Sequence, residues 1–179
     1  MGLFDFLSPL KVFNPVKLAA SAVQALKPAP NPPARKVTRL VVHCTAGPPT
    51  QPIAEILNYW KRVHPTWKGR PGYHIIIAAN GTSTRLQPDS DYTNGVAGFN
   101  ANSLHVCYTG GQNGIDTRTE AQKRELLRVL ARWRATYPDA IICGHRDLSP
   151  DLNKDGRITP NEWIKQCPSF NAIPEYQHL

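Results

Sequence analysis

The sequence lacks any apolar run long enough to span a bilayer, and it is poor in aromatic and acidic residues. Hydrophobic residues make up 41% of its 179 positions and aromatic residues 8%, which is typical of an ordinary soluble globular domain with a short appendage. The N-terminus has no basic stretch followed by a clean apolar core and a small-residue cleavage site. We therefore expect neither a membrane-spanning segment nor a secretory signal peptide.

The shortage of acidic residues leaves a formal net charge of +8, from 21 Lys and Arg against 13 Asp and Glu. A basic chain favours an anionic partner. Nucleic acid, an acidic membrane face and the phosphate-rich bacterial envelope all meet that requirement, so charge alone does not choose among them.

Cysteine is also too sparse, at four residues, to indicate a disulfide-stapled secreted scaffold. Cys44, Cys107 and Cys143 lie in or beside apolar, strand-like runs, which predicts buried free thiols. Cys167 differs because it follows a short polar segment near the end of the chain.

A proline-dense stretch, "KPAPNPPAR" at 27–35, predicts a stiff linker that divides the chain. Before it, Asn14 and Pro15 suit the N-cap and the first turn of a helix with one apolar face. We expect an amphipathic helical segment at 1–27, a Pro-rich linker at 28–36 and one domain at 37–179. The helix could lie on a membrane surface, dock on another protein or pack back on its own domain.

Strand-like and helix-like runs alternate within the domain. Strands are expected at 37–45, 73–82, 103–111 and 139–145. Helices are expected at 52–63, from a Thr119–Gln122 capping box to about Tyr137, and at 160–166. This alternation predicts an α/β fold in which helices flank a central β-sheet.

Three possible soft-metal ligands lie at the ends of these elements: His43, His145 and Cys167. Two imidazoles and a thiolate form a three-ligand set typical of catalytic zinc, which leaves a position for water or substrate. The ligands are far apart in the sequence, and a histidine near a strand end is more often a hydrogen-bonded structural residue. Spacing alone therefore leaves both interpretations open.

Five stretches occur in a familiar order: "VVHCTAG", "GYHIIIAANGT", "NANSLHVCYTGG", "IICGHRDLSPD" and "IKQCPSF". Together they resemble the zinc-dependent N-acetylmuramoyl-L-alanine amidases of the phage lysozyme type, which share a fold with peptidoglycan recognition proteins. The resemblance covers about residues 38–170. It implies a mixed central β-sheet flanked by helices, to which this chain adds an N-terminal helical extension, and cleavage of the amide bond between N-acetylmuramic acid and L-alanine.

The resemblance also implies roles for particular residues. His43, His145 and Cys167 match the family's zinc ligands. Tyr73 and Lys165 match its catalytic tyrosine and lysine. Lysine would supply positive charge to the developing oxyanion, and tyrosine would position the water or donate to the oxyanion. Taken singly, a solvated lysine and an edge-strand tyrosine would be the plainer interpretations.

Three positions near this site depart from the family pattern or are ambiguous. His74 follows Tyr73 and could line the substrate groove, or it could be a strand histidine that faces the core. Phage relatives often have a histidine where this chain has Gly95, so any substrate contact of that histidine is absent here. His105 lies where many relatives have glycine, and we expect it to be structural.

The stretch "DLNKDGRITPNE" at 151–162 matches a twelve-residue calcium-binding loop at its diagnostic positions. The predicted ligands are Asp151, Asn153, Asp155, Arg157 through its carbonyl, Thr159 and Glu162. An incoming helix is missing, and an Asx-rich surface turn is the alternative. A structural calcium ion here would support the segment that presents Lys165 and Cys167.

The sequence thus predicts a peptidoglycan hydrolase with catalytic zinc and structural calcium, of phage or prophage origin, acting as an endolysin or a virion-associated lysin. Its partner would be bacterial peptidoglycan, with a membrane surface or virion proteins bound through residues 1–27 and no nucleic acid. It would move from the host cytoplasm to the periplasm and cell wall after membrane disruption, or travel with the virion. One alternative is a non-catalytic peptidoglycan-binding module on the same fold. The other is a structural or regulatory protein in which the N-terminal segment matters most and the amidase fold serves as a docking body.

Overall fold

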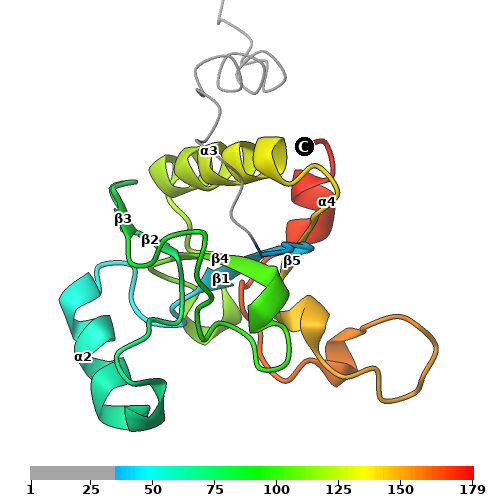
Figure 1. Cartoon of the computed structure of the whole chain (residues 1–179), viewed down its shortest axis with the longest axis horizontal. Coiled ribbons are helices and arrows are strands. Elements are labelled where there is room, and N and C mark those ends of the chain that lie inside the picture. Colours follow the sequence, from blue (N-terminus) through cyan, green and yellow to red (C-terminus); the bar gives the residue numbers. More distant parts are fainter. Residues whose placement is uncertain (1–34) are drawn as a thin grey trace, which may run out of the picture.

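The computed structural model describes residues 35–179, so the segment predicted at 1–27 and residues 28–34 of the predicted linker lie outside the described residues. Five strands form one sheet in the order β3-β2-β4-β1-β5 (Figure 1). The strands are β1 (Arg39–Cys44), β2 (Ile75–Ile77), β3 (Ser83–Arg85), β4 (Ser103–Tyr108) and β5 (Ile141–Gly144). Neighbouring strands pair in parallel except β2 with β3, which are antiparallel, so the sheet is mixed as predicted.

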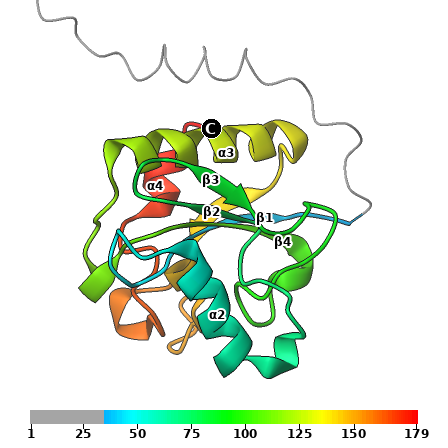
Figure 2. The same ribbon diagram turned by 90° about the vertical axis from the view of Figure 1, so that its left-hand side faces the viewer.

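Helices cover both faces of the sheet. They are α2 (Ile53–Val63), α3 (Glu120–Thr136) and α4 (Ala172–Tyr176). Figure 2 shows α3 and α4 on one face and α2 on the other, which gives three layers. Among residues 35–179, no helix is long and apolar enough to cross a membrane.

The main core lies between the sheet and the layer that contains α3. Leu40 and Val42 of β1 pack there with Leu126, Leu130 and Trp133 of α3, and all five are buried. Burying each such side chain stabilises the fold by about 1.5–3 kcal/mol. Because side chains alternate along a strand, Val41 and His43 of β1 point to the opposite face, and Val41 packs in a separate core cluster there.

The predicted start of α3 is confirmed. The Thr119 side chain accepts the N–H of Gln122, and the Gln122 side chain accepts the N–H of Thr119, at 3.1 and 3.0 Å. The Gln122 amide also donates to the carbonyl of Thr109, at 2.9 Å. The capping box therefore fixes both the first turn of α3 and its position against the sheet.

The last helix predicted at 160–166 is wrong. Only a single turn forms at Pro160–Glu162, and Trp163 then takes an extended conformation. The Glu162 carboxylate turns back and accepts hydrogen bonds from the N–H groups of Leu152 and Thr159. These bonds close the loop that precedes it. The sequence analysis also missed β3 and α4, which follow the Asn80–Gly81 turn and the "CPSF" stretch.

Helix α4 is held in place by a buried arginine in the loop before α3. The Arg118 guanidinium forms ion pairs with Asp116 and Glu175, at 2.8 and 2.6 Å, and lies over the Phe170 ring. Its bonds with these two partners raise the pKa of Arg118, despite the burial that opposes them. This contact anchors the C-terminal end of the segment that follows Cys167.

Candidate active site

Strand pairing brings two distant histidines together. β1 and β5 are parallel neighbours, and Val42 of β1 is paired with Gly144 of β5. In both segments the next residue is a histidine. His43 is on β1 and His145 directly follows β5. Their ring centroids are 5.0 Å apart, and both side chains are buried. They lie on the face of the sheet that is opposite α3.

The third member, Cys167, comes from an irregular segment that is tied to the sheet. Its carbonyl accepts the N–H of Arg146 at 2.8 Å. The next carbonyl, of Pro168, accepts the Tyr108 hydroxyl at 2.7 Å, and the Ser169 hydroxyl donates to the carbonyl of Gly111 at 3.3 Å. These bonds fix the position of Cys167 although no helix or strand carries it.

The three side chains form the His–His–Cys cluster: His43, His145 and Cys167. Their ligand atoms lie within 4.8 Å of one another, and Cys167 Sγ is 3.6 Å from His43 Nδ1. It is the one convergent group of three or more His, Cys, Asp or Glu side chains in the described part of the chain. The structure thus brings together the three residues that the sequence predicted as one ligand set.

The protonation chemistry of the cluster fits a soft cation such as zinc. Burial lowers the pKa of His43 well below its ordinary 6.5 and that of His145 to about 4, so both imidazoles are neutral near pH 7. Burial raises the pKa of the Cys167 thiol well above 9.0, so this thiol needs a nearby cation to ionise. Neutral imidazole and thiolate are the donors that zinc prefers.

A cavity opens beside the cluster. It has a volume of about 250 Å³ and is lined by Thr45, Gly47, Gln51, Ile56, Tyr59, Trp60 and Tyr73. The Tyr73 ring lies 4.9 Å from the His43 ring and 5.2 Å from the Trp60 ring. Burial raises the pKa of the Tyr73 phenol well above 10.0, so its hydroxyl remains a donor at neutral pH. Tyr73 therefore joins the cluster to the cavity.

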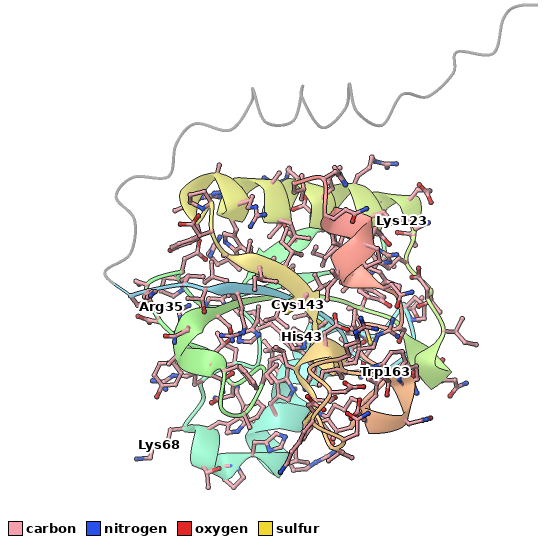
Figure 3. All side chains as sticks on the ribbon, turned by 90° about the vertical axis from the view of Figure 1, so that its right-hand side faces the viewer. Arg35, His43, Lys68, Lys123, Cys143 and Trp163 are labelled. Carbon is pink, nitrogen blue, oxygen red and sulfur yellow. The ribbon has the colours of Figure 1, made fainter. Side chains whose placement is uncertain are left out.

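Lys165 is exposed, two residues before Cys167. After burial, its positive charge contributes to the lowered pKa of His43 and of His145. The segment that contains it is fixed by Arg146, whose guanidinium lies 3.9 Å from the centre of the Trp163 ring. Figure 3 shows Trp163 and His43 on the same side of the sheet, away from Lys123 on α3.

His74 is not at the cavity. Its side chain is fully buried, its Nδ1 accepts the N–H of His105 at 3.0 Å, and its Nε2 lies 3.1 Å from the carbonyl of Asp91. Burial lowers its pKa to about 4. With no exposed surface, His74 is placed as the core-facing strand histidine that the sequence offered as the alternative to a substrate contact.

Residues that the sequence analysis did not assign to the site also contribute to it. Trp60 lies in the helix predicted at 52–63, and it forms a wall of the cavity. His105 lies against the cluster, with its Nδ1 3.0 Å from His43 Nε2. The sequence signal that could have pointed to His105 is the pair of departures from the family pattern, at Gly95 and at His105. These two residues lie against each other in the structure.

The loop predicted to bind calcium folds on itself. Asp151 accepts the N–H of Gly156, Asn153 accepts that of Asp155, and Asp155 accepts that of Arg157. Its carboxylates do not form a convergent group. One carboxylate oxygen, Asp151 Oδ1, is buried and has no hydrogen-bond partner among the described residues. The geometry of this loop gives no support to a calcium site.

An α/β domain with a buried His–His–Cys cluster at a cavity is the arrangement of a zinc hydrolase. The family described as N-acetylmuramoyl-L-alanine amidase, which is zinc-dependent, matches residues 33–168, so the chain belongs to this family. An endolysin of Enterobacteria phage K11 is 30% identical over 146 residues, 76% of this chain and 83% of that protein. An uncharacterized protein of Haemophilus influenzae is 50% identical over 81 residues, 43% of this chain and 70% of that one.

Solved structures share the fold. The amidase LysC of Clostridium intestinale has a TM-score of 0.60 at 20% identity, covering 79% of this chain and 82% of that one. Drosophila peptidoglycan recognition protein SA has a TM-score of 0.57 at 14% identity, covering 85% and 84%. The family and fold implied by the sequence motifs are therefore confirmed.

A test of the site's geometry is Gly144→Ala. A Cβ at residue 144 would lie 2.4 Å from Pro168 Cδ, so the segment that holds Cys167 must shift. We expect the free energy of unfolding, measured by urea titration, to fall by about 1–3 kcal/mol. Zinc binding, measured by competition with a chelator, should become weaker. Ile141→Ala, at a 61% exposed position of the same strand, is the control. Unchanged stability of Gly144→Ala would contradict the close packing of Gly144 on Pro168.

Proposed function

We propose that this chain hydrolyses the amide bond between N-acetylmuramic acid and the L-alanine of the stem peptide in bacterial peptidoglycan, at the cavity beside the His–His–Cys cluster. The observation that carries the proposal is the convergence of two neutral imidazoles and a thiol within 4.8 Å, next to Tyr73, in a chain of this amidase family.

His43, His145 and Cys167 would hold the zinc ion. Zinc in such a site supplies Lewis-acid chemistry, in which it activates water and polarises the scissile carbonyl. The sheet and the Cys167 segment hold the three donors within 4.8 Å of one another. The buried setting excludes competing water from the donors and strengthens electrostatic interactions inside the site.

Lys165 and Tyr73 would act on the substrate itself. When water attacks the amide, negative charge develops on the carbonyl oxygen and needs positive charge and donors nearby. Lys165, which is exposed and lies two residues before Cys167, would supply the positive charge. Tyr73, which keeps its proton at neutral pH, would hold the attacking water or donate to the oxyanion.

The test is mass spectrometry of purified peptidoglycan fragments after incubation with the protein. Wild type should release free peptides that begin with L-alanine and leave the glycan chains intact. Cys167→Ala should show no cleavage, and Lys165→Gln should lower kcat by about 10²–10³. Lys123→Gln, on the opposite face of the sheet, is the matched control and should cleave like wild type.

The second candidate, a non-catalytic peptidoglycan-binding module, gains some support from the shared fold with peptidoglycan recognition proteins. It predicts a different result in the same experiment. Zinc-loaded wild type would retain peptidoglycan without cleaving it, and Cys167→Ala would behave in the same way. That outcome would replace hydrolysis with binding as the function.

The similarity to endolysins supports a phage or prophage enzyme that acts on the cell wall once the membrane is breached, or one carried by the virion. In either setting residues 1–27 would be an amphipathic anchor, joined by the 28–36 linker to the catalytic domain at 37–179. The full chain should then bind vesicles with anionic lipid or co-purify with particles, while residues 37–179 should do neither and still cleave soluble fragments. Failure of the full chain in both assays would remove this role.

Calcium binding at 151–162 remains a proposal that rests on the sequence pattern alone. Binding would require the carboxylates of Asp151, Asp155 and Glu162 to turn from backbone N–H groups toward a shared ion. If they do, calcium should raise the melting temperature of wild type but not of Asp151→Asn. Equal melting curves with and without calcium would leave the loop as an Asx-rich turn.

A further inference from the structure

His43 uses both of its ring nitrogens. Nδ1 faces the cluster, 3.6 Å from Cys167 Sγ, and Nε2 faces away from it, 3.0 Å from Nδ1 of His105. Both histidines are fully buried, so water does not replace either contact. A ring held at both edges in this way has its orientation fixed.

The donor and acceptor of the His43–His105 bond follow from the ligand set. A histidine that coordinates a metal through Nδ1 is neutral and carries its proton on Nε2. This Nε2–H group points at the His105 ring, 3.0 Å from its Nδ1, whose lone pair can accept the proton. His105 then carries its own proton on Nε2, which is buried and has no hydrogen-bond partner among the described residues.

The backbone of His105 is fixed by His74. The His74 N–H donates to the His105 carbonyl at 2.9 Å, and the His105 N–H donates to His74 Nδ1 at 3.0 Å. His74 is in turn held by contacts with Asp91 and Thr93. The strand position of His105 is thus fixed by His74 on one side and by its pairing with Val41 of β1 on the other, and its Nδ1 lies 3.0 Å from His43 Nε2.

The space for the His105 ring exists because residue 95 is glycine. A Cβ at Gly95 would lie 2.4 Å from His105 Nδ1 and 2.6 Å from Cγ, closer than any non-bonded contact allows. The backbone of Gly95 has no positive φ, so its missing side chain, and not its conformation, is what matters. A side chain at residue 95 and the His105 ring therefore cannot both occupy this space.

We propose that His105 is a positioning residue of the zinc site: its Nδ1 accepts the Nε2–H of His43, which selects the tautomer and orientation in which His43 Nδ1 binds the metal, and Gly95 makes room for the ring. Partners of this kind around metal-bound histidines typically change metal affinity about 10–100-fold when they are removed. The inference rests on the proposed zinc site, and it goes beyond it by adding a residue that touches neither metal nor substrate.

The experiment compares three substitutions of His105 in the full-length protein. Asn places an amide oxygen near the position of Nδ1, Gln places it one carbon farther away, and Leu removes the acceptor. Zinc dissociation constants are measured by competition with a chelator, and the visible spectrum of the cobalt(II)-substituted protein reports the coordination geometry. Urea unfolding of each metal-free variant separates loss of the site from loss of the fold.

We expect His105→Leu and His105→Gln to raise the zinc dissociation constant about 10–100-fold and to alter the cobalt spectrum. His105→Asn should stay near the wild-type values. If Leu fails to fold, the Asn and Gln variants decide the question by themselves, and equal affinities for them would overturn the proposal. Wild-type affinity and spectrum for Leu would also overturn it, because His105 would then only fill space.

A wild-type protein that binds no zinc would refute the proposed zinc site itself, which distinguishes the two failures. The claim that Gly95 makes room for the His105 ring is tested by Gly95→Ala, which should weaken zinc binding in the wild-type background. In a His105→Gly background the same methyl group has room and should cost no further affinity. An equal loss in both backgrounds would show that Gly95 does not act through the His105 ring.

Discussion

The site depends on the register of β1 between its two parallel neighbours. Pairing Val42 with Gly144 places His43 beside His145, and pairing His43 with Cys107 fixes β1 against β4 on its other side. A shift of one residue would turn His43 into the core beneath α3 and bring Val42 to the cavity side, because strand side chains alternate. The buried aliphatic residues of β1 forbid that shift, so the packing of the core and the assembly of the cluster are one constraint.

Much of the fold was predictable because its signals are local. The apolar runs of β1, β4 and β5 and the capping box of α3 predicted elements that the structure contains. The errors lie where a local signal competes with a tertiary contact. The run at 160–166 has helical spacing, but the Glu162 carboxylate is used to close the preceding loop and Trp163 stacks on Arg146.

The candidate site was predictable to a different degree. His43, His145 and Cys167 could be grouped only through the resemblance to a family, since 124 residues separate the first from the last along the chain. Positions that follow from packing were out of reach. His74 lies next to Tyr73 in sequence, yet alternation along the strand turns it into the core, and the contact between Gly95 and His105 depends on the approach of a loop to β4.

The four cysteines are all free and buried, and the domain holds together by strand pairing, apolar packing and the Arg118 ion pairs. Its folding therefore requires no oxidant, because no disulfide contributes to the fold. Reactive thiolates are normally accessible ones, and here each sulfur is shielded by the fold. The folded domain thus contains no covalent cross-link that a reducing agent could break.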